Sequence, residues 1–196
     1  MIVVVMAGGK SSRMGARIEK PLLRLGKQTL LERTISAIGD SKVGEVMVAT
    51  TPATPKTAKF AIKKGLAVIE TPGKDYHEDV YFLLGRLGPY LSVNADIPFI
   101  DGKSIDLLLS KARKKSIACV IPLTSVPFPV SDDSVGKGED GVEYVWIGLN
   151  YVTPSPETDI LVMEDESLAM NINTPLDLAL ASKMFSERKR EGGGLI

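Results

Sequence analysis

Short apolar runs alternate with amphipathic segments over the first two thirds of the chain. The apolar runs, rich in Val, Ile and Leu, predict strands at Ile2–Met6, Glu45–Thr50, Leu66–Glu70, Tyr90–Asn94 and Ile117–Ile121. The segments between them predict helices at Gln28–Ile38, Lys56–Lys64, Glu78–Leu87 and Lys103–Lys114. Such runs are typical of strands that are buried on both faces of a parallel sheet. Repeated strand–helix units predict an α/β fold, a three-layer α/β/α sandwich with a mostly parallel central sheet.

The pattern changes after Pro122. Residues 123–141 are rich in Pro, Gly and Ser and carry mixed charge, which predicts a loop or excursion. Val142–Thr153 and Ile160–Met163 then predict two further strands. We expect both to be antiparallel additions to one edge of the sheet.

A closing helix is predicted at Pro175–Glu187, with Thr174 as its N-cap and Pro175 at its first position. Neither an internal repeat nor a linker rich in Pro, Gly or Ser separates two halves of the chain. The sequence therefore predicts one domain over residues 1–190, and a disordered tail at 191–196 where glycines follow a basic run.

The composition excludes several classes of protein. The 24 Lys and Arg balance the 24 Asp and Glu, so no global field attracts nucleic acid or an anionic membrane. The apolar runs fall short of the ~20 residues of a membrane span, and Ile2–Met6 is too short for a signal peptide. We therefore expect a cytoplasmic protein. Cys119, the single cysteine, cannot form an internal disulfide and is predicted to be a buried thiol.

A glycine-rich basic stretch, AGGKSSRMG at residues 7–15, directly follows the first predicted strand. Ligands of open α/β sheets bind beyond the carboxyl ends of the strands, and loops of this kind commonly bind phosphate. Val4 stands where a Walker A loop requires its first glycine. The glycine spacing does not fit the G-x-G-x-x-G turn of dinucleotide-binding proteins either.

The stretch matches instead A-G-G-x-x-x-R-M-G followed by Glu19-Lys20-Pro21, which resembles the signature of nucleotidyltransferases. A mobile basic surface loop is the alternative. The resemblance implies that Gly8 and Gly9 admit the nucleotide closely, and that Arg13 holds the phosphates that leave as pyrophosphate. Lys20 would neutralise charge at the α-phosphate. The nucleotide-binding residues in this stretch would be Ala7, Gly8, Gly9, Lys10, Ser11, Ser12 and Gly15.

Asp96, in the stretch NADIP after the fourth predicted strand, is the candidate ligand for Mg²⁺ in such an enzyme. A second oxygen ligand is expected from the stretch NINTP, where the resemblance favours Asn173, with Asn171 nearby. Asp96 and the two asparagines are also residue types that merely cap turns and helices, so that alternative stays open.

Seven stretches in order over nearly the whole chain carry a narrower resemblance: AGGKSSRMG, EKPLLRL, ATTPATPKT, TPGKDYHED, NADIP, GLNYV and NINTPLDL. Together they resemble the archaeal adenosylcobinamide-phosphate guanylyltransferases, which are similar to the molybdenum-cofactor guanylyltransferases. The resemblance implies a Rossmann-like nucleotidyltransferase fold. It also implies transfer of GMP from GTP, with Mg²⁺, to adenosylcobinamide phosphate with release of pyrophosphate, in cobalamin biosynthesis. A homodimer is compatible with the sequence.

Other residues are candidates for contacts with the two substrates. A carboxylate suits the N1–H and N2–H₂ donors of guanine, so Asp79 and then Glu78 are expected to read the base, unless they only start a helix. The candidates for contacts with the acceptor are Lys56, Asn150 and Asn171. The alternatives are that Lys56 is simply solvated and that Asn150 belongs to a core strand. His77, the only histidine, lacks a G-x-S-x-G elbow beside it and is expected at the surface.

The expected reaction is a direct in-line displacement at the α-phosphorus, with catalysis by Arg13, Lys20 and Mg²⁺ on Asp96. Two alternatives remain at this point. One is a related nucleotidyltransferase that acts on molybdopterin or a sugar 1-phosphate. The other is a nucleotide-binding protein that does not catalyse.

Overall fold

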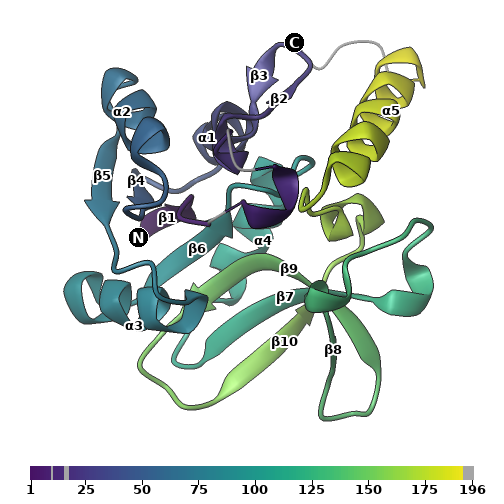
Figure 1. Ribbon diagram of the computed structural model, residues 1–196. Coiled ribbons are helices and arrows are strands. Elements are labelled where there is room, and N and C mark those ends of the chain that lie inside the picture. Colours follow the sequence, from purple (N-terminus) through teal and green to yellow (C-terminus); the bar gives the residue numbers. More distant parts are fainter. Residues whose placement is uncertain (10, 16–17, 192–196) are drawn as a thin grey trace.

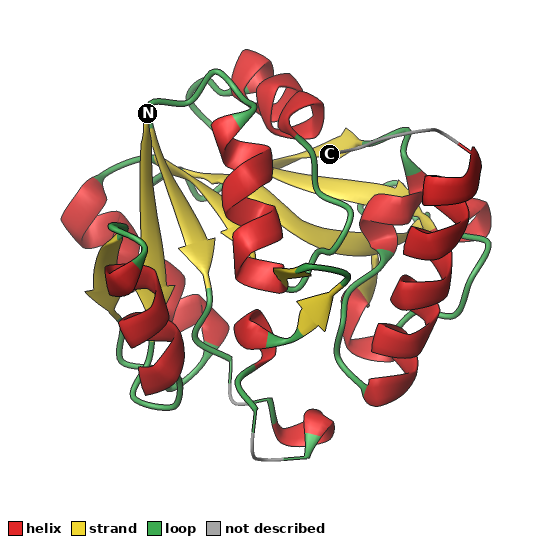
Figure 2. Ribbon diagram, turned by 90° about the horizontal axis from the view of Figure 1, so that it is seen from above, coloured by secondary structure: helices red, strands yellow, loops and turns green. Residues whose placement is uncertain are grey.

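The computed structural model describes residues 1–9, 11–15 and 18–191, and its centre is an eight-stranded sheet with helices on both faces (Figures 1 and 2). The strand order is β10-β7-β9-β6-β1-β4-β5, and β8 pairs with β9. The strands are β1 (Ile2–Met6), β4 (Glu45–Thr50), β5 (Ala67–Glu70), β6 (Tyr90–Asn94), β7 (Ser116–Pro122), β8 (Val135–Lys137), β9 (Glu143–Val152) and β10 (Thr158–Val162). A separate hairpin consists of β2 (Arg24–Leu25) and β3 (Gln28–Thr29).

The helices form the two outer layers of the sandwich. They are α1 (Leu30–Gly39), α2 (Pro55–Lys63), α3 (Tyr76–Leu87), α4 (Gly102–Lys111) and α5 (Pro175–Glu191). The largest apolar cluster joins one face of the sheet to α1, α2 and α4, and α3 covers part of the other face. The predicted α/β/α sandwich with a mostly parallel sheet is thus confirmed. No helix in the described ranges is long and apolar enough to cross a lipid bilayer.

The predicted strands and helices agree with the structure, apart from their ends. Residues 28–29 belong to β3, and α1 begins at Leu30, because a capping box closes its first turn. In that box Thr29 Oγ1 accepts from the Glu32 backbone N–H, and Glu32 accepts from the Thr29 N–H. Helix α4 ends at Lys111, three residues before the predicted end.

The two late strands correct the prediction about the sheet edge. Strand β9 is antiparallel, as predicted, but it lies between β6 and β7 and hydrogen-bonds to both. Strand β10 is at the edge, but it pairs parallel with β7. The gap between β6 and β7 requires a strand with both backbone edges paired, and the apolar alternation of β9 fits this position. Sequence pattern alone does not specify such an insertion.

The predicted loop at 123–141 contains a strand that its composition concealed. Residues Val135–Lys137 pair with the start of β9 as β8. The closing helix is capped by Thr174, whose hydroxyl accepts from the Asp177 N–H at 3.2 Å, as predicted. It continues through the basic run to Glu191, the first residue of the predicted tail, whereas residues 192–196 lie outside the described residues.

Candidate active site

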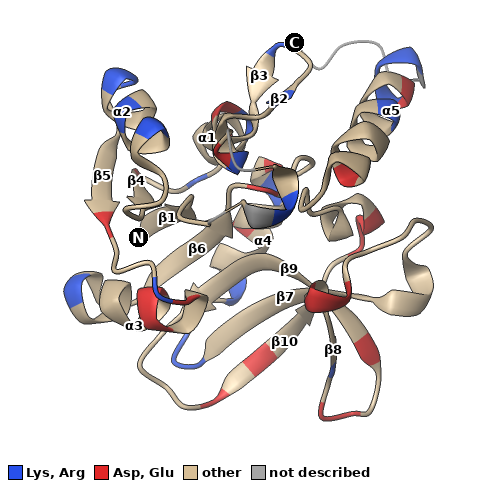
Figure 3. Ribbon diagram, viewed as in Figure 1, with Lys and Arg blue, Asp and Glu red and all other residues tan. Residues whose placement is uncertain are grey.

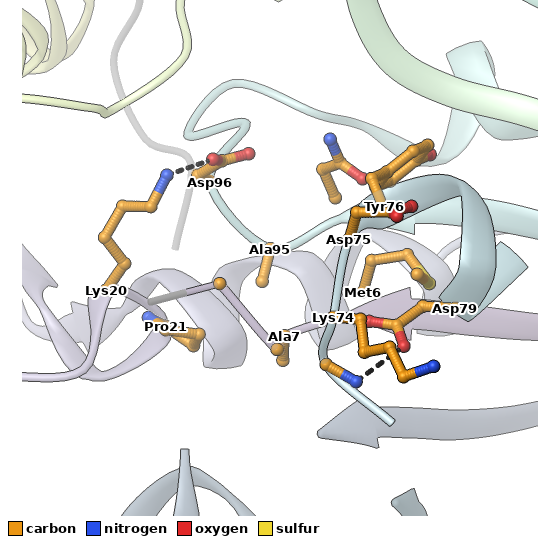
Figure 4. Close-up of a pocket in the computed structure, with 14 residues that line it drawn as sticks. Met6, Ala7, Lys20, Pro21, Lys74, Asp75, Tyr76, Asp79, Ala95 and Asp96 are labelled. Atoms are coloured by element: carbon orange, nitrogen blue, oxygen red, sulfur yellow. Dashed lines mark hydrogen bonds and ion pairs between the residues drawn. The ribbon is translucent and has the colours of Figure 1, made fainter. Parts of the chain in front are cut away.

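A cavity of about 380 Å³ opens at the carboxyl ends of β1 and β6 (Figure 4). Its volume lies within the range of small-molecule sites, and its position is the one at which open α/β sheets bind ligands. The walls come from the loop after β1, the segment before α3, the end of β6, and the start of the short helix η2 (Lys20–Leu22). The lining residues are Met6, Ala7, Gly8, Gly9, Lys20, Pro21, Gly73, Lys74, Asp75, Tyr76, Asp79, Asn94, Ala95 and Asp96.

Thr51 packs between two glycines of the cavity wall. Its hydroxyl donates to the Gly8 carbonyl at 2.7 Å, and a Cβ at Gly8 would collide with its methyl group. A Cβ at Gly73, which has φ +69°, would lie 2.7 Å from Thr51 Cβ. Gly9, in contrast, has no neighbouring heavy atom within 4 Å of its Cβ position. Gly8 is therefore required by packing within the protein, and Gly9 is the glycine that leaves open space.

Lys20 brings the two predicted metal ligands together. Its Nζ donates to Asp96 Oδ2 at 2.6 Å and to Asn173 Oδ1 at 2.9 Å. The three residues are far apart in the sequence, and the backbone joins two of their segments, because the Ile172 N–H donates to the Asp96 carbonyl at 3.0 Å. Figure 4 shows Lys20 reaching Asp96 from one side of the cavity, with Asp79 and Tyr76 on the other side. The sequence motifs thus converge on one point.

The same group suits a hard divalent cation. Asp96 Oδ1 is buried and has no hydrogen-bond partner among the residues that the structure describes, so one oxygen is left for a further ligand. Asp96 and Asn173 offer oxygen donors only, and Mg²⁺ typically takes one or two protein oxygens, with phosphate and water completing its shell. No group of three or more His, Cys, Asp or Glu suited to a metal occurs in the described ranges. A Mg²⁺ site at Asp96 and Asn173 remains a prediction.

Arg13 points to the excursion after β7 and is not among the residues that line the cavity. Its guanidinium contacts Asp133 Oδ2 at 2.7 Å and donates to Ser131 Oγ at 3.3 Å. Both side chains of the ion pair are more than half exposed, so the pair contributes little to stability. The predicted contact of Arg13 with phosphate stays a prediction.

Ser11 of the glycine-rich loop has a left-handed backbone, at φ 52°. Its hydroxyl accepts from the Lys20 N–H at 3.0 Å, which ties the loop to the residue that carries the ammonium group. Gly15 also has a positive φ, of 74°. Ser12 begins a short helix, whereas Lys10 lies outside the described residues.

Glu19 has a structural role that the sequence did not reveal. Its carboxylate accepts hydrogen bonds from the Lys56 N–H at 2.9 Å, the Thr57 N–H at 2.6 Å and the Thr57 hydroxyl at 2.6 Å. It thereby satisfies two free N–H groups at the start of α2. The same contacts hold Glu19 in place, and with it the backbone that leads into Lys20. Glu19 belongs to the stretch EKP, and Lys56 and Thr57 belong to the stretch TPKT, so this contact joins two of the sequence motifs. Lys56 itself lies in the first turn of α2, outside the cavity lining.

Of the two candidate guanine readers, Asp79 lines the cavity and Glu78 does not. Asp79 is buried, and its Oδ1 accepts from the Gly73 N–H at 2.8 Å. Glu78 is directed to solvent and pairs with Lys74 Nζ at 3.3 Å. Asp75 caps α3 by accepting from the Glu78 N–H. The geometry therefore favours Asp79 as the carboxylate that faces a ligand.

Tyr76 is a cavity residue that the sequence reasoning missed. Asn150 Nδ2 donates to its hydroxyl at 3.3 Å, and desolvation, the largest cause, raises the pKa of the Tyr76 phenol. Asn150 lies opposite Ser92 in the β6–β9 register, so both belong to the wall beside Tyr76. His77 is exposed, and Asn171 only donates to the Ala169 carbonyl at 3.4 Å. A lone Tyr in a charged loop gives no sequence signal that would have distinguished it.

Comparison with known proteins identifies relatives of this chain. Residues 3–133 match the model of the MobA-like NTP transferase domain. The adenosylcobinamide-phosphate guanylyltransferase of Methanocaldococcus jannaschii is 33% identical over 95% of this chain and 98% of its own. A probable molybdenum cofactor guanylyltransferase of Thermococcus sibiricus is 29% identical over 62% of this chain and 61% of its own.

A solved structure shares the fold. The 4-diphosphocytidyl-2C-methyl-D-erythritol synthase of Anaerococcus prevotii superposes with a TM-score of 0.68, at 12% identity, over 94% of this chain and 95% of its own. At that identity the likeness concerns the fold alone, whereas the match to the domain model extends over most of the chain. The chain therefore belongs to the MobA-like NTP transferase family and is a nucleotidyltransferase.

Proposed function

We propose that this protein transfers GMP from GTP to adenosylcobinamide phosphate and releases pyrophosphate. The observation that carries the proposal is the meeting of Lys20, Asp96 and Asn173 beside the glycine-rich cavity. The choice of guanine and of this acceptor is supported by the full-length similarity to the Methanocaldococcus jannaschii enzyme. The Thermococcus sibiricus relative matches over a smaller part of both chains, so molybdopterin is the second acceptor to test.

The reaction is a direct displacement. An oxygen of the acceptor phosphate forms a bond to the α-phosphorus of GTP, while the bond from that phosphorus to the oxygen bridging to the β-phosphate breaks. The acceptor phosphate is already anionic near pH 7, so the protein needs no nucleophile or general base of its own. Lys20 Nζ offsets the negative charge that gathers as two anions meet, and its place is set by Ser11 and Glu19.

Two further groups would act on the nucleotide. Asp96 and Asn173 would hold Mg²⁺, which supplies a Lewis acid that neutralises phosphate charge. Asp79 would accept hydrogen bonds from the N1–H and N2–H₂ groups of guanine. Its carboxylate has acceptor sites for them besides the one that the Gly73 N–H occupies. Arg13 would exchange its exposed contact with Asp133 for the phosphates that leave.

The test is a pyrophosphate-release assay with Mg²⁺, each nucleoside triphosphate, and adenosylcobinamide phosphate, molybdopterin or glucose 1-phosphate as acceptor. We expect turnover with GTP and the corrinoid. Lys20→Ala and Asp96→Ala should each lower kcat by about 10²–10³-fold with circular dichroism unchanged. Ile62→Ala, at an exposed position on α2, is the matched control. Binding of GTP without turnover for any acceptor would contradict the proposal, and so would near-wild-type activity in either site variant.

A further inference from the structure

Half of one sheet face is left without a helix. Helix α3 covers the face of β1, β4 and β6 on its side of the sheet. Beyond β6, the strands β9, β7 and β10 continue on that side, and among the described residues Figure 1 shows no α-helix in front of them. A sheet face in a sandwich of this class is ordinarily buried, so an uncovered one marks a surface for a ligand or partner.

The uncovered face is apolar. We call it the open apolar face. Its exposed side chains are those of Trp146, Ile160 and Val162, and the buried Ala118 and Val120 of β7 lie between them in the register. Register places them side by side, since Val120 lies opposite both Trp146 and Val162, and Ala118 opposite Ile160. Trp146 and Ile160 are each 36% exposed, and Val162 is 48% exposed. The Trp146 indole lies against Gly136 of β8, where any Cβ would meet its ring.

This face is continuous with the active-site cavity. Along β9 the side chains that alternate toward it are Trp146 and Asn150, with Gly148 between them. Gly148 has φ +80°, and its Cβ position is only 2.7 Å from Asn94 Cγ. Asn94 is itself a cavity residue. The open apolar face therefore begins where the cavity wall ends.

Two buried polar atoms mark the border between them. Ser92 Oγ and Asn94 Oδ1 are both buried and have no hydrogen-bond partner in the described part of the chain. Buried oxygens of this kind are normally satisfied, and these two stand on the strand that separates the cavity from the open apolar face.

The surroundings bear on the occupant of this face. Acidic residues lie along β8 to β10 (Figure 3), but by strand alternation Asp159 and Glu143 belong to the other side of the sheet, and Asp159 pairs with Lys115. A second copy of the chain needs far more area. At 36% exposure, even a side chain of about 250 Å² presents only about 90 Å². The three exposed members alone thus fall well below the about 800 Å² per partner that a stable dimer buries, so a second copy would have to bury neighbouring surface as well.

We infer that the open apolar face carries the ring system of the acceptor, while its phosphate reaches into the cavity. This rests on the proposed function, in which the acceptor is a corrinoid: a flat macrocycle with peripheral amides and a phosphate on an amide-linked arm. From β9 to β10 the face spans two strand spacings, about 10 Å, which is the scale of such a ring. Trp146 packs on the macrocycle.

The experiment compares two acceptors, adenosylcobinamide phosphate and aminopropanol phosphate, which is the phosphorylated arm without the ring. Trp146→Ala should raise KM for the corrinoid about tenfold and leave both the Kd for GTP and kcat/KM for the ring-free acceptor unchanged. Trp146→Phe keeps a flat ring and should retain most of the affinity. Ile62→Ala, an equally apolar exposed change on α2, should affect neither acceptor.

The outcomes separate the inference from the proposed function. An unchanged KM for the corrinoid in Trp146→Ala, or equal losses with both acceptors, would refute the inference while transfer by the wild type upholds the proposed function. A change of oligomeric mass in Trp146→Ala, measured by sedimentation, would assign the face to self-association and also refute it. No transfer by the wild type to either acceptor would remove the proposed function and the inference together.

Discussion

Thr51 and Gly8 form a contact whose energy can be measured directly. Thr51 is buried, and its hydroxyl holds the Gly8 carbonyl at 2.7 Å. Gly8→Ala would drive a methyl group into Thr51 Cγ2, but the next neighbours of that methyl lie at 3.4 and 3.6 Å, which is ordinary contact. The clash therefore depends on a single atom. Thr51→Ser removes that atom and keeps the hydroxyl.

The magnitudes follow from this geometry. Gly8→Ala alone overfills a packed site and should lower the free energy of unfolding by about 1–3 kcal/mol. Thr51→Ser alone loses one buried methyl group and should cost about 0.5–1.5 kcal/mol. In the double variant the new methyl occupies the space of the lost one. We therefore expect the double variant to be no less stable than Thr51→Ser. The cost of Gly8→Ala would then disappear in that background, which corresponds to a coupling energy of about 1–3 kcal/mol.

Urea unfolding of the four proteins measures the coupling. Gly9→Ala is the control, because its Cβ position has no neighbour within 4 Å, so its free energy of unfolding should stay within about 0.5 kcal/mol of the wild type. Its methyl group faces the side on which nucleotide is proposed to bind, so calorimetry should show weaker GTP binding. Costs of Gly8→Ala and Thr51→Ser that add to within about 0.5 kcal/mol would refute the packing argument.

Three further predictions concern single residues. Glu19→Gln sets an amide against the donors that start α2, so it should lower the unfolding free energy by about 1–2 kcal/mol and lower kcat more than GTP affinity, as unfolding and steady-state kinetics would show. Lys64 and then the Thr29 backbone N–H hold the pKa of Glu32 at about 2, below its usual 4.5. Its stabilisation is therefore present above pH 4.5 and lost as pH falls through 2, so acid unfolding of Glu32→Gln should be less steep. Burial raises the pKa of Cys119 to about 12, so alkylation at pH 8 should modify it only after unfolding.

Local sequence was sufficient for the helices and for most strands of the main sheet, but not for β8 or the β2–β3 hairpin. The strand at Ile2–Met6 follows from an uninterrupted apolar run, and the α5 start follows from Thr174 and Pro175. The motif with Lys20 indicated a nucleotidyltransferase through its resemblance to the signature of that class, A-G-G-x-x-x-R-M-G followed by Glu19-Lys20-Pro21. These features depend only on residues that are neighbours in the chain, so the local sequence pattern is enough to predict them.

Contacts between distant segments were decided by the tertiary structure. The meeting of Lys20 with Asp96 and Asn173 needs the end of β6, η2 and the loop before α5 to converge, and no spacing in the sequence encodes that distance. The anchoring of Glu19 on α2 is of the same kind.

The sheet shows the same division. The sequence by itself determined that β9 is an apolar strand, because alternation is local. Only the tertiary structure decided that it enters between β6 and β7, because pairing depends on which backbone edges the earlier strands leave free. That insertion leaves Trp146, which is 36% exposed, on the half of the sheet face beyond the part that α3 covers. The sequence thus determined most of the elements and the reactive groups, because these depend on local pattern, and long-range packing decided which of them meet.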